Sequence, residues 1–456
     1  MPDAFTQALS LALDLTSPAL LAAPAPGSTF ELFTAPSTER VRMAQQRFLW
    51  DMYRGEQLTF IPRLPGESTL EFLRRPHKCA LNFTRVLVDI LSQLYRRPVE
   101  RTLEGDAGAV ERIQRALSRN PLDRLLLTCD RLARLQGVAA LRVSYEQGEL
   151  RFWPWPAHRL AVLPQPQQPD RPAAVVALPA GAADVAHVWT AERFACVAAG
   201  RVADEQEHGY GCIPFVFAHD RLPVDGFWVE GRGHAVAPAN AEFNAKLSEL
   251  AHTIAMQGFG VMEIVNPDPA QDIAVGPGRA IRFTVSGNEP YGISFKSPQA
   301  PVAELLQDLE FFLRALLKSQ RIPESVLSVH ATSGQSGVAI LAQQTPVLED
   351  RVERRQVFAA FEHELLACAL ALLREHEGLR GACSLRVDFP EPELEQSASE
   401  RMQMDDWRLR RGLATPWELM RRDDPDAWPD LESARAAWLA NRDALREAGL
   451  APEINL

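Results

Sequence analysis

The fold is decided by two segments of similar length, APANAEFNAKLSELAHTIAM at residues 237–256 and PVAELLQDLEFFLRALLKSQR at residues 301–321. Apolar side chains recur in both at intervals of three and four residues, so each segment predicts a long helix with one apolar stripe. At ~1.5 Å per residue, the first helix is about 30 Å long. The residues between them alternate strand-like runs with turns such as Gly276-Pro277-Gly278. Together the two segments predict a helical hairpin whose tip is rich in strands.

The half of the chain before this hairpin predicts a mixture of helices and strands. Ser37 is a candidate N-cap for one helix, and residues 78–95 are apolar nearly all round, which predicts a buried helix that Pro98 closes. Residues 108–136 predict two more helices, joined at Asn120-Pro121. Alternation of apolar and polar residues then predicts a series of strands, two of which form a hairpin around residues 146–148. The predicted strands lie at 139–145, 150–155, 159–163, 173–178, 185–190 and 213–217.

The part after the hairpin predicts mainly helix. A polar loop at 323–336 precedes the longest helical segment, which runs to about residue 375. Because proline removes a backbone hydrogen bond and clashes with the preceding turn, we expect a kink or a restart at Pro346. A strand at 384–389 and a helical tail up to residue 456 follow, so the whole chain is predicted to be α+β.

Composition excludes several classes of protein. The 456 residues carry 48 basic and 59 acidic side chains, a net charge of −11, which is unlike a sequence-reading DNA-binding module. A hydrophobic fraction of 46% and a charged fraction of 23% are typical of a globular protein and exclude disorder. The six cysteines lack C-x-x-C and zinc spacings, so we expect free thiols in a reducing cytosol.

The N-terminal residues 1–36 are rich in alanine and proline, and we expect an extended arm with a short helix. Their apolar run is similar to a signal peptide, but no basic residue precedes Arg40, and Asp14 and Pro18 interrupt the run. We therefore predict no signal peptide, and we expect no segment of this chain to span a membrane.

No catalytic constellation emerges from the sequence. It contains no phosphate-binding G-x-x-x-x-G-K-[ST] loop and no H-E-x-x-H, because His363-Glu364 and His376-Glu377 lack a second histidine one helical turn on. The acidic pairs Asp405-Asp406 and Asp423-Asp424 stand in charged helical segments, which favours a solvated face over a metal site. We expect no enzyme activity, no cofactor and no bound metal.

A series of landmarks in fixed order carries a family resemblance. They are Asn82-Phe83 with Pro98-Val99, the strand at 153–163, Ile213-Pro214, Asn244 with Leu247-Ser248, and the runs at 275–281, 336–340 and 411–418. In this order they resemble the portal, or head-to-tail connector, proteins of tailed double-stranded-DNA bacteriophages. The chain departs from the family where Gly231-Arg232-Gly233 stands in place of the frequent Gly-x-Ser, and in its N-terminal arm, which matches nothing in the family.

The resemblance implies a multi-domain portal fold: a helical stem hairpin with a β-rich clip, an α/β wing, a long kinked helix and a helical crown. Its expected parts are an N-terminal arm at 1–36, the wing at 37–235, stem helix 1 at 236–257, the clip at 258–298, stem helix 2 at 299–322, the tunnel loop at 323–336, the long helix with a wing strand at 337–396 and the crown at 397–456.

The resemblance also implies a function without catalysis. The protein would form a ring of twelve at one capsid vertex, through which double-stranded DNA is packaged and ejected without sequence specificity. Its expected partners are the terminase large subunit, a head-completion or tail adaptor protein, the major capsid protein and the scaffold. It would be found in the virion and, during assembly, in the host cytoplasm. A ring of twelve carries twelve times −11, or −132 formal charges, and a bore with few basic rings lets DNA slide.

Three sets of candidate site residues follow from the same resemblance. DNA would pass the tunnel loop at Ser328, His330, Thr332 and Gln335, and the stem at Lys246, Lys318 and Arg321. Candidate clip contacts to the terminase are Asp268, Asp272, Arg279 and Glu289. The stem cations could instead pair with helix ends or with a neighbouring subunit, and the loop residues could simply be solvated.

Two other functions remain open at this stage. A non-ring helical scaffold or adaptor would explain the apolar stripes as an ordinary helical bundle. An unrecognised metal-dependent nuclease would use the acidic C-terminal segment that contains Asp405 and Asp406.

Overall fold

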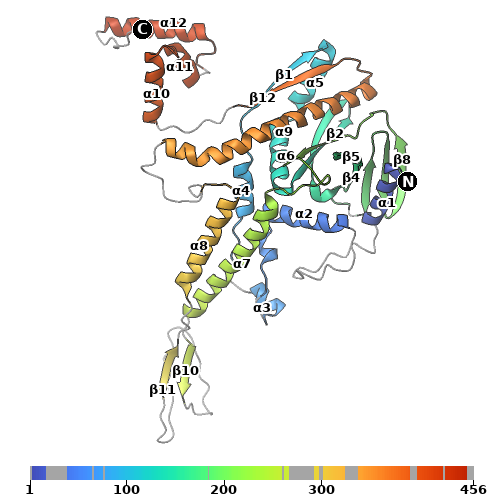
Figure 1. Ribbon diagram of the computed structural model, residues 1–456, viewed down its shortest axis with the longest axis vertical. Coiled ribbons are helices and arrows are strands. Elements are labelled where there is room, and N and C mark those ends of the chain that lie inside the picture. Colours follow the sequence, from blue (N-terminus) through green and yellow to red (C-terminus); the bar gives the residue numbers. More distant parts are fainter. Residues whose placement is uncertain are drawn as a thin grey trace. The chain divides into compact units, whose positions relative to one another are not determined.

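The computed structural model describes residues 3–16, 38–63, 66–74, 78–182, 184–258, 261–265, 292–296, 301–323, 337–390, 398–424 and 427–448 (Figure 1). The chain divides into two compact units. The main unit comprises Met1–Val326 and Pro346–Pro390, and the C-terminal unit comprises Leu327–Thr345 and Glu391–Leu456.

The main unit mixes helices and sheets, which confirms the α+β prediction. Its helices up to residue 136 are α1 (Ala4–Thr16), α2 (Thr38–Arg54), α3 (Thr69–Arg74), α4 (Phe83–Leu91), α5 (Ala107–Arg119) and α6 (Leu122–Gln136). Short 3₁₀ helices lie at Gln57–Phe60 and Ala157–Arg159. The predicted junction between α5 and α6 is confirmed, since the buried Asn120 side chain donates to Ala116 O and Leu150 O at 2.8 and 3.0 Å.

The helix predicted over 78–95 was too long at both ends, because α4 covers only Phe83–Leu91 and Ser92 is its C-cap. Asn82 caps α4 by accepting a hydrogen bond from the backbone N–H of Arg85, so the helix begins only at Phe83. The preceding residues run alongside another helix instead, as described below. Nor is α4 buried all round, because the side chain of Val86 is exposed.

A three-stranded sheet lies at the centre of the main unit, in the order β3-β2-β9. The strands are β2 (Val138–Glu146), β3 (Glu149–Pro156) and β9 (Phe215–His219), all antiparallel. The predicted hairpin is confirmed: Gln147 and Gly148 form a two-residue turn with φ of 53° and 81°. Positive φ at both turn positions matches the twist of paired strands.

A second, five-stranded antiparallel sheet has the order β4-β5-β6-β7-β8. It contains β4 (Leu160–Gln165), β5 (Gln168–Ala177), β6 (Val185–Trp189), β7 (Arg193–Ala198) and β8 (Arg201–Glu207). Helix α1 packs on it, burying Phe5, Ala8 and Ala12 against Val176 and Val188. The short helix expected in the N-terminal segment thus closes a hydrophobic core.

The long helix α9 (Gly337–Glu377) contains Pro346 as a single continuous element, so the helix does not restart there. Strand β12 (Cys383–Asp388) pairs antiparallel with β1 (Glu100–Gly105). One segment of the described chain, Thr345–Glu377, is long and apolar enough to cross a membrane by length and composition alone. Of the most apolar stretch in this segment, 56% is buried, and Phe358, Phe361 and Leu373 belong to the main core. These contacts identify it as a core helix.

The predicted helical hairpin is confirmed. Helices α7 (Gly233–Gly258) and α8 (Val302–Ser319) lie side by side, and between them in sequence β10 (Val261–Val265) pairs antiparallel with β11 (Gly292–Lys296) (Figure 1). The apolar stripes meet in a cluster of Phe243, Leu250 and Leu309, with Phe83 and Phe312 packed against it.

The C-terminal unit contains the predicted helical tail, with helices α10 (Ala398–Arg410), α11 (Pro416–Asp423) and α12 (Leu431–Glu447). Thr415 and Glu418 form a capping box at the start of α11. The rings of Trp417 and Trp438 lie 5.7 Å apart, so α11 packs on α12.

Candidate functional site

The helical hairpin is held against the rest of the main unit by a row of polar side chains on α7. Asn240, Asn244 and Ser248 repeat every four residues, so they lie on one helix face, and all three are buried. They bind the backbone of residues 79–84, which leads into the first turn of α4. Asn244 accepts from Leu81 N at 2.9 Å and donates to Leu81 O at 3.0 Å, while Ser248 accepts from Cys79 N at 2.9 Å.

Asn240 completes this row, although none of the landmarks in the sequence includes it. Its Oδ1 accepts from both the backbone N–H and the hydroxyl of Thr84 at 3.0 Å, and its Nδ2 donates to Leu81 O at 2.8 Å. The landmarks include Asn244 and Ser248 but not the polar stripe with a period of four that Asn240 begins. A polar stripe and a separate apolar stripe on one helix indicate that the helix packs against two different parts of the protein.

A glycine turn positions the start of α7 against the end of α6. Gly137 ends α6 with φ of 86°, a left-handed conformation that favours glycine. A Cβ on Gly231 would lie 2.5 Å from Gly137 N, and one on Gly233 would lie 2.2 Å from Leu135 O. Gly231 and Gly233 thus stand where two backbones meet too closely for any side chain.

Arg232, between these glycines, belongs to a buried ion network. Arg354 on α9 donates to Asp130 Oδ1 at 3.0 Å and also to Asp220. Arg134 on α6 donates to Asp220 Oδ1 and Asp350 Oδ1, both at 3.2 Å. Arg232 donates to Asp350 at 3.3 Å.

The network consists of three arginines and three aspartates, Arg134, Arg232, Arg354, Asp130, Asp220 and Asp350, so its formal charge is zero. Burial alone lowers the pKa of Arg354, but the neighbouring Asp130 and Asp220 carboxylates outweigh it and the pKa is raised. The guanidinium therefore stays charged. The network joins α6, the residue after β9, the start of α7 and α9 into one electrostatic unit.

Of the three predicted stem cations, Lys246 bridges the two helices of the hairpin. Its ammonium lies 3.1 Å from Asp308 Oδ2 on α8 and 3.7 Å from Glu242 on α7, and 5.1 Å from the ring centre of Phe312. The hydrogen bond to Asp308 raises the pKa of Lys246. This contact ties α7 to α8 within one chain, in addition to any role in a channel.

Lys318 and Arg321 lie at the end of α8, and both side chains are exposed. Arg321 has φ of 57° and occupies the left-handed position after the helix. The N–H of Ile322 bonds to Leu317 O at 3.0 Å and that of Arg321 to Lys318 O at 3.1 Å, the pattern of a Schellman motif. Ile322 and Leu317 are both buried and supply its apolar contact.

We expect Arg321→Gly to stabilise the main unit by about 0.5–1 kcal/mol, because glycine adopts the left-handed position without a Cβ clash. The variant also removes a positive charge that lowers the pKa of Arg232. Urea unfolding measures the change. Lys318→Gly is the matched control and is expected to cost about 1 kcal/mol, since Lys318 lies within the helix. If both variants changed the free energy of unfolding in the same direction, the assignment of backbone strain to Arg321 would be contradicted.

The remaining predicted site residues lie outside the described residues. These are Ser328, His330, Thr332 and Gln335 of the loop, and Asp268, Asp272, Arg279 and Glu289 of the tip.

Residues considered for catalysis have structural partners. Arg422 binds Asp405 at 2.7 Å and Arg410 binds Asp406 at 2.8 Å. His363 Nε2 is 2.8 Å from Leu385 O, and His376 stacks on Tyr145. Within the described residues, no group of three or more His, Cys, Asp or Glu side chains could hold a metal ion.

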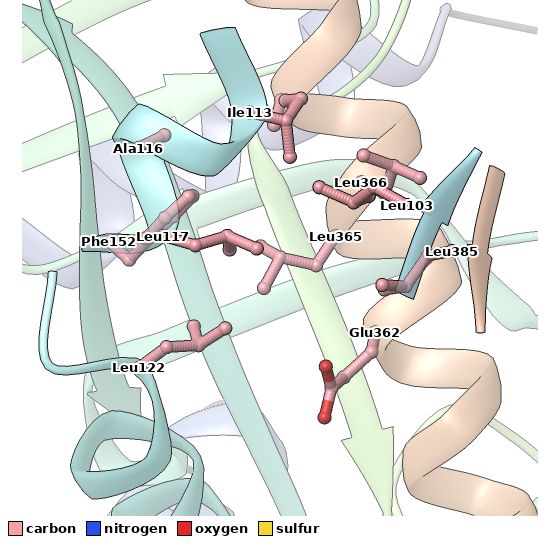
Figure 2. Close-up of a pocket in the computed structure, with 11 residues that line it drawn as sticks. Leu103, Ile113, Ala116, Leu117, Leu122, Phe152, Glu362, Leu365, Leu366 and Leu385 are labelled. Atoms are coloured by element: carbon pink, nitrogen blue, oxygen red, sulfur yellow. The ribbon is translucent and has the colours of Figure 1, made fainter. Parts of the chain in front are cut away.

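A small cavity in the main unit is lined mostly by apolar side chains from α5, α9 and the β1–β12 pair (Figure 2). Its volume is about 20 Å³, room for about one water-sized sphere. The carboxylate of Glu362, drawn at its edge in Figure 2, accepts from Tyr95 Oη at 2.9 Å and from Arg101 Nε at 2.6 Å. Because this acid is fully partnered and the cavity is so small, we assign it a packing role.

The hairpin exposes apolar side chains on its outer surface. Phe311 on α8 is 71% exposed, while the adjacent Phe312 packs into the hairpin core. At 3.6 residues per turn, Phe311 points away from the buried row Leu309, Leu316 and Leu317. Leu81, whose backbone binds Asn244 of α7, and Val86 of α4 are also exposed. A single chain therefore leaves apolar surface uncovered beside both α8 and α4.

No protein-family model and no curated protein matches the chain. Among solved structures, it is similar to a chain of the virion of a native gene transfer agent particle, at 14% identity and a TM-score of 0.43, covering 83% of this chain and 95% of that one. It is also similar to a chain in the neck of a native gene transfer agent particle computed with C12 symmetry, at 13% identity and a TM-score of 0.40, covering 90% and 95%. A third is a crystal structure of an HK97 family phage portal protein from Corynebacterium diphtheriae, at 12% identity and a TM-score of 0.32, covering 70% and 94%.

Proposed function

We propose that this chain is a portal protein: a ring of twelve copies at one capsid vertex, through which double-stranded DNA enters and leaves. The observation that carries the proposal is the hairpin of α7 and α8 with its β10–β11 pair, together with the apolar side chains exposed on α8 and on the segment of residues 81–86 that packs against α7. A ring gives every copy two neighbours through two different surfaces, so it covers both sides at once.

The contacts in the hairpin support a role as one wall segment of such a ring. The buried row Asn240, Asn244 and Ser248 fixes α7 on the main unit, and Lys246 fixes α8 on α7. Both helices are thereby oriented before assembly. The face of α8 with Phe311 would pack against the next copy, where Leu81 and Val86 supply an apolar surface.

In this proposal the parts keep the boundaries expected from the sequence. Residues 258–298 form the clip that meets the terminase large subunit and later the tail adaptor, through Asp268, Asp272, Arg279 and Glu289. Residues 323–336 form the tunnel loop, with Ser328, His330, Thr332 and Gln335 beside the DNA. Residues 397–456 form the crown. Energy for DNA movement comes from the terminase, and the chain itself has no catalytic role.

The native mass of the purified protein tests the proposal. We expect a species near twelve times 50.7 kDa, about 608 kDa, because the uncovered apolar surface favours closed association. Native mass spectrometry or mass photometry measures it. A monomer or dimer at micromolar concentration, with no larger species even when the scaffold and capsid protein are co-expressed, would favour the helical adaptor instead.

A further inference from the structure

A groove runs between α9 and β12 in the main unit, and its volume is about 500 Å³. Leu366 and Leu370 are buried and form an apolar floor, whereas His363 and Arg374 are exposed. Because helix positions spaced by three or four residues share a face, one side of α9 supplies this floor. The groove is lined by residues 382–385, His363, Leu366, Ala367, Leu370 and Arg374.

One wall of the groove is a strand edge that no other strand of the described chain covers. Strand β12 belongs to a two-stranded sheet with β1, so its second edge is open. The N–H of Asp106 donates to Ala382 O at 2.9 Å, and in an antiparallel pair the backbone groups of alternate residues then face away from the partner strand. Those residues are Cys383 and Leu385, and Leu385 O lies 2.8 Å from His363 Nε2 on α9. At this carbonyl, the edge that faces the groove is therefore covered by a side chain.

Strand β8 is a second open edge, and it is acidic. It is the last strand of the five-stranded sheet, and all seven of its residues are exposed. Among the edge strands whose burial is described, only β8 is exposed at every residue. Its sequence, RVADEQE at residues 201–207, carries three acidic side chains and one basic side chain. In the groove, Arg374 has no carboxylate partner among the described residues, so the two edges are complementary in charge.

We propose that β8 of one copy of this chain adds as a strand to β12 of a second copy, in the groove along α9. Backbone hydrogen bonds to Cys383 and Leu385 hold the added strand, and one of its N–H groups replaces His363 at Leu385 O. The carboxylates of β8 reach Arg374, and Val202 covers the apolar floor. From His363 to Arg374, α9 extends about 16 Å at ~1.5 Å per residue, which is room for about five residues of strand.

This contact names a surface through which neighbouring copies meet, so it deepens the proposed ring and to that extent rests on the proposed function. It joins two different surfaces, so each copy in a row keeps one free edge for the next copy. Open strand edges invite pairing with another chain, and this pairing covers both edges at once. The same contact also forms in an open dimer and does not need a closed ring.

A photo-cross-linker in place of Gln206 tests the contact in the full chain. The residue p-benzoylphenylalanine at this exposed position leaves the groove and the acidic side chains unaltered. Isotope-labelled and unlabelled copies are mixed before assembly, irradiated and digested. We expect mass spectrometry to find cross-links from residue 206 to residues 363–374 or 382–385 of a different copy. Arg374→Glu is expected to lower their yield roughly tenfold, because it brings like charges together, and Arg374→Lys should keep most of the yield.

The matched control carries the same cross-linker at Trp153, which is 68% exposed on the edge strand β3. Pro154 and Pro156 lack a backbone N–H, so β3 is a poor strand to add and should give no cross-link to the groove. Should the variant at Gln206 fail to fold, the cross-linker at the exposed Ala203 replaces it. Cross-links from β8 to other segments only, or a yield in the groove no higher than from residue 153, would overturn the proposal. The native mass of the same samples keeps the two proposals apart: a ring without groove cross-links rejects only this contact, and cross-linked dimers without larger species reject only the ring.

Discussion

Replacing Asp220 by alanine is expected to destabilise the main unit by about 3–5 kcal/mol, because it leaves buried arginines without a compensating charge. The Asp220 side chain is almost fully buried and accepts hydrogen bonds from both Arg134 and Arg354. Its removal leaves the network of three arginines and three aspartates with a net charge of +1 inside the protein. Urea unfolding, followed by near-UV circular dichroism at fixed protein concentration, measures the loss.

The control for this prediction is Asp308→Ala in the same unit. Asp308 also pairs with a cation, Lys246, but its side chain is 56% exposed, so the expected cost is below about 1 kcal/mol. Asp220→Asn should lie between the two, because it keeps a hydrogen-bond acceptor but loses the charge. A cost for Asp220→Ala no larger than that for Asp308→Ala would contradict the expectation that Asp220 compensates buried arginine charge.

The network connects the root of the hairpin to α6 and α9. Arg232 stands one residue before α7, and it shares Asp350 with Arg134 of α6. Arg354, one turn after Asp350 on α9, shares Asp220 with the same Arg134. A displacement of α9 would therefore break charge pairs at the start of α7. In the proposed ring, this contact would couple the long helix to the stem.

Sequence patterns were sufficient for elements whose own side chains determine them. The apolar stripes of 237–256 and 301–321 predicted α7 and α8, and Gln147-Gly148 marked the hairpin. The helix expected from residue 78 was wrong because the backbone of 79–82 pairs with Asn244 and Ser248, far away in sequence. A local pattern cannot show a partner of that kind. Strand β8 was not predicted because every residue in it is exposed, so buried apolar residues do not alternate with polar ones along it.

The candidate site was less predictable than the fold. The ion network draws its six residues from four separated segments, and single charges in each segment look solvated when read alone. One signal was present: Asp130 and Arg134 lie in a mostly apolar helix, where an acid and a base one turn apart are expected to have buried partners. The stem cations were assigned by resemblance, and only the structure reveals that Lys246 is held by Asp308.

Phe311→Glu is expected to abolish the proposed ring while leaving each chain folded. Phe311 is largely exposed on the face of α8 that points away from α7, so the folded chain loses little when it is replaced. In a ring the same side chain would be covered by the next copy, and an uncompensated charge there costs several kcal/mol at every interface. Twelve equivalent interfaces multiply this penalty, so even a modest cost at each prevents closure.

Native mass and unfolding measurements together separate the two effects. Phe311→Glu should give a species of about 50.7 kDa in place of the ring, with a circular dichroism spectrum like that of the unaltered chain. The matched control is Leu222→Glu, because Leu222 is 81% exposed but lies between β9 and α7, outside the hairpin. It should leave the ring intact. A full ring formed by Phe311→Glu would remove this face of α8 from the interface, and dissociation by both variants would indicate a general response to added charge.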